Sequence, residues 1–409
     1  MVRWIIFISI YFLIDIYAFQ AIKTVSKSQW LHWLYFIVSI VLLGLFIYQL
    51  TGGVHGRQMT PSRMYTFGLF LTIFVPKLLV IIVMFGEDII RFGVGLFSKF
   101  GGSDNGFYLP SRRKFISTIA IGMAAIPFAS LLYGMYRGKY NYKVLKYALE
   151  FDDLPEAFDG YTITQISDVH SGSFDNKKKV AYGVDLINEQ QSDVILFTGD
   201  LVNNKADEML PWKEYFSKLT AKDGVYSVLG NHDYGDYIGW PTEVDKKNNL
   251  QKLKDIQKEM GWKLLLNEHV EITRNGEQIK LIGVENWGAG GFKKAGDLEK
   301  ACAGVSKTDF KILMSHDPSH WAEKVKQDDR HFHLTLSGHT HGMQFGIEIP
   351  GWFKWSPVKY RYEHWAGIYE ELGRYINVNR GFGFLGYPGR VGIWPEVTVI
   401  QLKKRVNSA

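Results

Sequence analysis

The sequence predicts a helical membrane region followed by an α/β domain, and two observations carry that prediction. The first third of the 409-residue chain is dense in Ile, Leu, Phe and Val, whereas the remainder has the mixed composition of a globular domain. From about Glu150, short β-rich runs alternate with amphipathic helical patterns, which is typical of layered α/β folds. We therefore expect a membrane region over 1–140 and a folded domain over 150–409.

Four apolar runs make up the membrane region: Trp4–Ile22, Trp30–Leu50, Phe67–Phe85 and Phe115–Tyr133. A helix that crosses a bilayer needs about 20 apolar residues, which the first three runs match well. The fourth is rich in Ala, Gly and Ser and is a weaker candidate. We expect about four transmembrane helices.

The orientation of these helices does not follow from charge counting. The flanking lysines and arginines divide seven against seven between the two sides, so the positive-inside rule gives a tie. The stretch Ser111–Ile116 resembles a twin-arginine export signal, which would carry the second domain across the membrane as an uncleaved anchor. Alternatively, its three basic residues mark a cytoplasmic flank and the domain stays on that side.

Two ionisable residues fall inside the expected spans, Asp15 in the first and Lys77 in the third. A single charge in lipid is costly, so the two residues either pair or line a polar cavity. The alternative is that Asp15 lies near the bilayer surface and that the Lys77 side chain extends towards it.

The second domain begins with the α/β pattern. Lys177–Glu189 and Asp245–Met260 are predicted amphipathic helices, and Arg374–Val378 and Val397–Leu402 are predicted late strands. Three Gly-rich or polar loops are candidates to frame a pocket: Asn203–Pro211, Tyr234–Val244 and Gly288–Gly296.

Five short motifs follow strand-like runs in this domain. They are Asp168-Val169-His170, Gly199-Asp200, Gly230-Asn231-His232-Asp233, Ser315-His316 and Gly338-His339-Thr340-His341. Residues at the ends of parallel strands converge on one rim of a sheet, so these side chains can share a site. The motifs supply imidazole and oxygen donors. Cys302 is the only cysteine, which excludes an intrachain disulfide and a thiolate metal cage.

Residues of these types suit a pair of divalent cations. Two cations about 3.5–4 Å apart can neutralise a phosphate and activate a hydroxide for in-line attack. Such a pair needs one carboxylate that bridges both ions, together with neutral imidazoles. The sequence thus predicts a hydrolytic metalloenzyme.

The ordered set of motifs resembles the calcineurin-like metallophosphoesterase superfamily, in a membrane-associated branch with twin-arginine or transmembrane N-termini. The resemblance covers Asp168 to His341 and extends to Pro395-Glu396-Val397-Thr398 near the C-terminus. It implies an αββα sandwich, in which two mixed β-sheets are flanked by helices. One departure is Met343, where the family usually has a second glycine.

The same resemblance implies the roles of the site residues. One metal is held by Asp168, His170 and His341, the other by Asn231, His316 and His339, and Asp200 bridges the two. His232 faces the phosphate as an acid or as a charge stabiliser, and Asp233 orients His232. The metals are expected to be manganese, with iron or zinc as alternatives.

Several further residues have two interpretations. In the second domain, the histidines outside the motifs are expected to be surface or structural residues: His269, His320, His331, His333 and His364. The aromatic-rich stretch from Trp352 to Trp394 is either core or a face that meets a bilayer or an acyl chain. Arg380 and Arg390 either contact a phosphate group or are solvated.

Together these patterns predict an integral protein of a bacterial-type cell membrane with an extracytoplasmic catalytic domain. We expect it to cleave phosphoester or diphosphate bonds by attack of a metal-activated hydroxide, on a phosphorylated lipid or cell-envelope substrate. The alternative is a membrane sensor or transport protein with a regulatory or binding domain. The net charge is +6, but the chain has no block of basic residues typical of nucleic-acid binding. The bilayer is therefore the expected partner. The sequence leaves the oligomeric state open.

Overall fold

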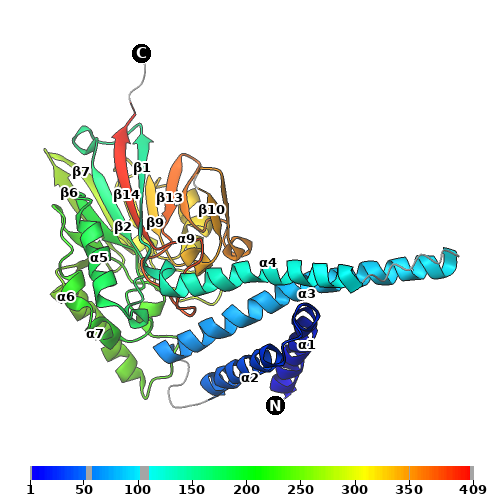
Figure 1. Cartoon of the computed structure of the whole chain (residues 1–409). Helices are drawn as coiled ribbons and strands as arrows, with labels where there is room; N and C mark the ends of the chain where they lie inside the picture. Colours follow the sequence, from blue (N-terminus) through cyan, green and yellow to red (C-terminus); the bar gives the residue numbers. More distant parts are fainter. Residues whose placement is uncertain (1, 52–57, 102–109, 350, 406–409) are drawn as a thin grey trace. The chain divides into compact units, whose positions relative to one another are not determined.

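The computed structural model describes residues 2–51, 58–101, 110–349 and 351–405 (Figure 1). These residues form two compact units. The first, which we call the membrane unit, is built from residues up to 54 and from 62–135, and the second, the catalytic unit, contains residues 136–409.

The membrane unit consists of four long helices: α1 (Val2–Val25), α2 (Gln29–Thr51), α3 (Pro61–Gly101) and α4 (Pro110–Tyr136). Within the described residues, all four are long and apolar enough to cross a membrane, which confirms the predicted spans. The helix α3 is much longer than its predicted apolar run. The helix continues past Phe85 through the charged residues Glu87, Asp88 and Arg91, because neither a proline nor a helix-ending glycine motif follows there.

The two intramembrane charges lie together inside this unit. Lys77 Nζ donates to Asp15 Oδ1 and to Ser39 Oγ, both at 2.5 Å, and Ser39 Oγ donates to Asp15 Oδ1 at 2.7 Å. All three residues are buried. Of the two alternatives, the structure therefore has the paired charges, and Lys77 also lines an apolar cavity between the helices.

A second charged cluster joins α3 to α4. Arg113 Nη1 lies 2.6 Å from Glu87 Oε2 and 2.6 Å from Asp88 Oδ1. Within this unit, Arg113 therefore helps to hold two helices together. That contact is independent of whether the Ser111–Ile116 stretch also acts as an export signal, which stays a prediction.

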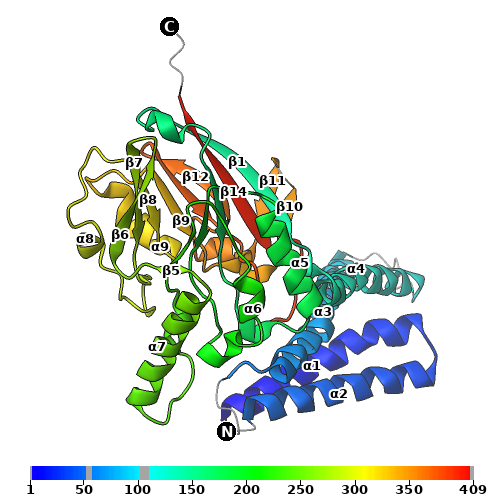
Figure 2. The same cartoon turned by 90° about the vertical axis from the view of Figure 1, so that its left-hand side faces the viewer.

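The catalytic unit contains two six-stranded sheets (Figures 1 and 2). The first has the order β1-β14-β2-β3-β4-β5, with the strands β1 (Lys143–Phe151), β14 (Glu396–Lys404), β2 (Thr162–Ile166), β3 (Val194–Phe197), β4 (Val225–Ser227) and β5 (Lys263–Leu264). The second has the order β12-β13-β9-β8-β7-β6, with β12 (Gly367–Glu371), β13 (Arg374–Val378), β9 (Leu334–Ser337), β8 (Lys311–Met314), β7 (Glu277–Gly283) and β6 (Glu268–Arg274). Both sheets are mixed. The strands β2, β3, β4 and β5 run parallel to one another, as do β7, β8, β9 and β13, and β1 is parallel to β14. The pairs β14–β2, β12–β13 and β6–β7 are antiparallel.

Alternation along the strands explains why the two sheets pack face to face. In β3, Val194 and Leu196 belong to the core between the sheets, whereas Ile195 and Phe197 face the helices outside the first sheet. Those outer helices are α5 (Lys177–Asn188), α6 (Lys213–Phe216) and α7 (Glu243–Glu259). The helices α8 (Leu298–Ala301) and α9 (Pro318–Glu323) cover the second sheet. The predicted αββα sandwich is confirmed.

A small antiparallel hairpin of β10 (Ile347–Ile349) and β11 (Phe353–Trp355) forms a separate two-stranded sheet. It follows the loop that holds the last predicted ligands, which lie in the short helix η8 (His341–Gln344) and just before it.

Candidate metal centre

All seven predicted ligands lie in loops at the carboxyl ends of parallel strands. Three of these strands, β2, β3 and β4, belong to the first sheet, and β8 and β9 belong to the second. The ligands whose backbones have positive φ are Asp168, His170, Asp200, His339 and His341. Such backbone geometry is unfavourable for residues other than glycine and concentrates at functional sites, where the surrounding fold enforces it.

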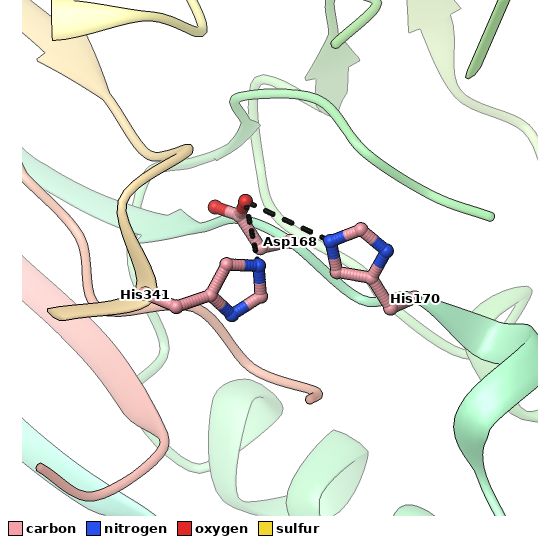
Figure 3. A group of neighbouring side chains, drawn as sticks. All are labelled: Asp168, His170 and His341. Carbon is pink, nitrogen blue, oxygen red and sulfur yellow. Dashed lines mark ion pairs between the residues drawn. The ribbon is translucent and has the colours of Figure 1, made fainter. Parts of the chain in front are cut away.

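The ligands form two groups whose donor atoms lie within 4.8 Å of one another. The first comprises Asp168, His170 and His341, which point towards a common centre in Figure 3. His341 Nε2 lies 3.3 Å from Asp168 Oδ1, and His170 Nε2 lies 4.0 Å from the same oxygen. These separations leave the donor atoms facing one another with room for a cation of radius typical of the first transition series.

The second group comprises Asp200, His316 and His339. Asn231 completes it, because its Oδ1 lies 2.8 Å from His339 Nδ1 and 3.1 Å from His316 Nε2. His339 therefore presents Nδ1 to the centre of this group, whereas His316 presents Nε2. This difference could not be read from the sequence.

Asp200 lies between the two groups. Its Oδ2 is 3.1 Å from His316 Nε2 in the second group and 3.6 Å from His170 Nε2 in the first. Its Oδ1 accepts the backbone N–H of His232 at 2.8 Å, which fixes the orientation of the carboxylate. A single oxygen thus faces donors of both groups, as a bridging ligand must.

The outer contacts of the imidazoles are consistent with metal binding. His316 Nδ1 lies 2.8 Å from the carbonyl oxygen of Thr198, which sets the tautomer that leaves Nε2 free to bind a metal. The ring of His170 is fully buried, and neither nitrogen has a hydrogen-bond partner among the described residues. A buried imidazole without partners is costly, and a metal at Nε2 would satisfy it. The donor set therefore fits a pair of cations.

The ionisation of the site depends on its buried charges. Burial favours the neutral form of Asp168, but nearby His341 outweighs it and lowers the pKa of this carboxyl. Burial likewise opposes charge on His316, yet the Asp200 carboxylate raises the pKa of His316 to about 10. Burial lowers the pKa of His170 and of His339, which favours the neutral imidazole that a metal requires.

The structure places His232 at the site but contradicts the role expected for Asp233. The ring of His232 lies 4.9 Å from that of His170, and its Nδ1 is 2.8 Å from the carbonyl oxygen of Asn203. Asp233 instead accepts four backbone N–H groups, from Asp200, Leu201, Val202 and Gly230, at 2.8–3.3 Å. Its carboxylate therefore organises the loops around the bridging residue, and a backbone carbonyl orients His232.

Both arginines of the C-terminal segment differ from expectation, because neither is solvated. The guanidinium of Arg390 is fully buried and donates to the backbone carbonyls of Gly383 at 2.7 Å and of Arg380 at 2.8 Å. Arg380 pairs with Glu396 and Glu348. Each arginine is thus saturated by protein groups, which leaves little for a phosphate.

The histidines of the second domain outside the motifs have structural partners, as expected. His320 Nδ1 lies 2.8 Å from Ser315 Oγ, His333 Nε2 lies 2.8 Å from Asp153, and His269 Nδ1 lies 2.9 Å from the carbonyl oxygen of Ala301. His364 pairs with Glu371 at 2.6 Å.

Three residues near the ligands were not singled out from the sequence. Asp317 Oδ2 lies 3.4 Å from His339 Nε2, and Tyr362 Oη lies 2.8 Å from the same nitrogen. Tyr237 Oη accepts a hydrogen bond from Asn231 Nδ2 at 2.7 Å. Asp317 directly follows the predicted ligand His316, and this position in the chain could have marked it as a residue of the site. The two tyrosines come from distant loops and carry no local signal.

Comparison with known proteins agrees with this geometry. Residues 161–343 match the calcineurin-like phosphoesterase family, and residues 2–139 match a family described as a probable calcineurin-like phosphoesterase transmembrane domain. The chain therefore carries a calcineurin-like phosphoesterase domain, preceded by the transmembrane domain of the second family.

Individual relatives carry the same description. The chain is 28% identical to the metallophosphoesterase YkuE of Bacillus subtilis over 72% of this chain and 98% of that protein. It is 27% identical to the metallophosphoesterase YkoQ of the same bacterium, over 70% of this chain and 99% of that protein. A transmembrane protein with a metallophosphoesterase domain from Danio rerio is 28% identical over 67% of this chain and 60% of that longer protein.

The departure at Met343 has a visible consequence. Its φ is +55°, a conformation that glycine adopts without strain, and its side chain is exposed beside the ligand loop. This chain therefore carries an apolar side chain at a position where the family usually has none.

Proposed function

We propose that the chain is a membrane-anchored phosphohydrolase that uses two divalent cations to cleave a phosphoester or diphosphate bond. The observation that carries the proposal is the position of Asp200 Oδ2, between His170 Nε2 at 3.6 Å and His316 Nε2 at 3.1 Å. A carboxylate placed in this way can serve two cations at once, and two adjacent cations are suited to phosphoryl transfer chemistry.

Seven residues would hold the cations. Asp168, His170 and His341 are assigned to one, Asn231, His316 and His339 to the other, and Asp200 to both. We propose manganese, although imidazole and carboxylate donors also suit iron and zinc. When bound, the cations offset the charge of the phosphate and lower the pKa of water in the site.

The remaining steps fall to protein groups. With Nδ1 of His232 held by the Asn203 carbonyl, Nε2 is the nitrogen available to the substrate. We assign to Nε2 the delivery of a proton to the leaving oxygen. Because Nδ1 keeps its own proton towards Asn203, Nε2 can donate only from the charged imidazolium. Burial lowers the pKa of His232, which makes this imidazolium a stronger acid but the minor form at neutral pH. Asp233 holds the Asp200 and Asn231 loops together through their backbone N–H groups.

The substrate in this proposal is a lipid-linked or cell-envelope phosphoester. Its support is that the site belongs to a chain with four helices able to cross a membrane, and that only residues 137–142 separate α4 from β1. We further propose that the catalytic unit is extracytoplasmic, which the Ser111–Ile116 pattern favours. A C-terminal reporter that is active only outside the cytoplasm should be active, and activity of a cytoplasm-specific reporter instead would refute this placement.

The full chain, purified in detergent and loaded with Mn²⁺, tests the chemistry. It should hydrolyse a generic aryl phosphodiester or a phosphorylated lipid. Asp200→Asn should lose both bound metal and turnover, because the amide is uncharged and replaces one of the two carboxylate oxygens with an NH2 group. His232→Ala should lose turnover but keep its metal. Asp207→Asn, on an exposed aspartate, is the matched control and should retain both.

Two results would contradict the proposal. If Asp200→Asn kept the full metal content and rate, the bridging assignment would be wrong. If the wild-type chain bound two metals per molecule yet hydrolysed none of a panel of phosphomonoesters, phosphodiesters and diphosphates, the alternative of a regulatory or binding module would replace the enzyme.

A further inference from the structure

The β10–β11 hairpin has an inverted arrangement of polar and apolar residues. Its register pairs Ile347 with Trp355, Glu348 with Lys354 and Ile349 with Phe353. Because side chains alternate along a strand, Glu348 and Lys354 share one face and the four apolar residues share the other. A hairpin on a water-soluble surface normally buries its apolar face.

In this hairpin the charged face is the one that packs against the protein. Glu348 Oε1 lies 2.5 Å from Arg380 Nη2. Lys354 Nζ donates to the backbone carbonyl of Ala366 at 2.5 Å and lies 4.3 Å from the centre of the Tyr369 ring. These contacts fix the orientation of the hairpin, so the apolar face is directed outwards by the fold itself.

The outward face is exposed. Ile347 is 56% exposed, Ile349 45% and Phe353 49%, and Trp352 in the connecting turn is 81% exposed. We call these four residues the hairpin patch. Apolar side chains grouped in this way mark an interaction surface, because exposing them to water is unfavourable.

The hairpin lies beside the point where the catalytic unit receives the chain from its last membrane helix. Residues Gly138–Tyr140 follow α4 directly, and Gly138 is packed so closely that a Cβ there would lie 2.2 Å from the carbonyl oxygen of Arg390 and 2.9 Å from the Trp394 ring. Gly346, just before β10, donates its N–H to the carbonyl of Val391 at 2.9 Å. One segment, 390–394, therefore contacts both the entry of the chain and the base of the hairpin.

Basic residues lie close to the hairpin in space and along the chain. A cavity of about 530 Å³ is lined by residues of the hairpin and of β1; Lys143, Lys146 and Trp394 contribute to it, together with the arginine-paired Glu348 and Glu396. Lys359, Tyr360 and Arg361, which follow β11, are all exposed. Tryptophan and tyrosine mixed with lysine and arginine are typical of surfaces at the level of lipid headgroups.

We propose that the hairpin patch inserts into the headgroup region of the bilayer in which the chain is anchored. The occupant is a lipid surface, because the patch combines outward apolar side chains with basic neighbours and lies next to the chain's exit from α4. Insertion also brings the loop that carries His339 and His341 close to the lipid. Ser356, just after β11, is joined to this loop because its Oγ donates to the carbonyl of Gly342 at 2.8 Å. The insertion itself does not depend on the nature of the reaction.

Site-directed fluorescence on the full chain in liposomes of mixed neutral and anionic phospholipid tests the proposal. The background is Cys302→Ala, which removes the single cysteine. An environment-sensitive probe is attached at Trp352→Cys, and at Phe353→Cys in a second preparation. The matched control is Val244→Cys, at an apolar residue of α7 that is 63% exposed. Thermal unfolding followed by tryptophan fluorescence shows that each variant is folded.

The probes at 352 and 353 should show blue-shifted emission and lose intensity when the lipids carry a quencher on the upper acyl chain. The probe at 244 should keep the emission typical of water and should not be quenched. Equal emission and equal quenching at 352, 353 and 244 would overturn the proposal. Blue-shifted emission without quenching by lipid would also overturn it, in favour of contact with a second copy of the chain. Because no turnover is measured, these outcomes are distinct from a failure of the proposed hydrolase activity.

Discussion

Replacing Gly338 with alanine should disable the first metal group without unfolding the protein. A Cβ at this position would lie 1.9 Å from Ser167 Oγ and 2.2 Å from Asp168 Oδ2, whereas ordinary contacts begin at 3.4 Å. Both partners are fully buried, so they cannot swing into solvent. The Asp168 carboxylate would have to move by about 1 Å or more, and overpacking of this kind costs about 1–3 kcal/mol.

The displacement matters because Asp168 is held from two sides. Its carboxylate oxygens accept the N–H of His339 at 3.0 and 3.1 Å and face His341 Nε2 at 3.3 Å. A shift of about 1 Å at a catalytic constellation can cost about a hundredfold in rate. We expect Gly338→Ala to lose at least one metal per molecule and to retain about 1% of the wild-type turnover or less.

The measurements are metal content by elemental mass spectrometry, hydrolysis of an aryl phosphodiester, and the midpoint of thermal unfolding. The midpoint should fall by about 2–4 °C for each kcal/mol lost. Gly239→Ala is the matched control, because its Cβ meets nothing within 4 Å and its φ is not positive. If Gly338→Ala matched this control in metal content and rate, the close approach of Gly338 to the ligand loop would not be a requirement of the site.

Two further predictions concern stability. Lys77→Met leaves Asp15 buried without its counter-charge and should destabilise the detergent-solubilised chain by about 3–5 kcal/mol. The double variant Asp15→Asn, Lys77→Met should recover much of that loss. Equal unfolding midpoints for the single and double variants would contradict the pairing. Burial lowers the pKa of His320 to about 4, below its unfolded value of 6.5. The stability that this neutral, buried imidazole gives to the folded state is therefore fully present above pH 6.5 and is lost as the pH falls towards 4. At pH 5 the loss of folding free energy amounts to about 2 kcal/mol. The unfolding midpoint of His320→Gln, measured by calorimetry, should therefore fall less between pH 7 and pH 5 than that of the wild type. An equal fall in both proteins would refute this prediction.

Much of the fold was predictable from local patterns. The helices α5 and α7 begin at Lys177 and Glu243, within two residues of their predicted starts, and the predicted strand Arg374–Val378 has the observed bounds. Asn176 and Thr242 cap the two helices, since each side chain accepts a backbone N–H from the first turn. These are local interactions, so they can be read from neighbouring residues in the sequence.

The roles of Asp233 and Arg390 could not be read in this way. The family resemblance implied that Asp233 orients His232, but its carboxylate accepts backbone N–H groups of the loop after β3, more than thirty residues earlier. Arg390 was expected either to contact a phosphate or to be solvated, yet it is enclosed by backbone carbonyls from the ligand loop and the C-terminal segment. Both outcomes depend on which loops the two sheets bring together.

The aromatic-rich segment divides between its two interpretations. Trp365, Phe382 and Phe384 are buried, whereas Trp352 and Tyr360 are exposed. Composition alone could not separate them, because the same residue types serve a core and a bilayer surface. The inward pairing of Glu348 with Arg380 is what turns the apolar face of β10–β11 outwards.

The sequence by itself determined the identity and order of the candidate metal ligands, the four apolar helices and the α/β character of the second domain. It could do so because these features depend on residue type and on spacing along the chain. The tertiary structure alone decided that Asp200 lies between both ligand groups, that His339 offers Nδ1, that Asn203 orients His232 and that an apolar hairpin faces outwards. Each of these features depends on contacts between loops of the two sheets that are far apart in the sequence. Local sequence patterns do not encode which distant loops come into contact.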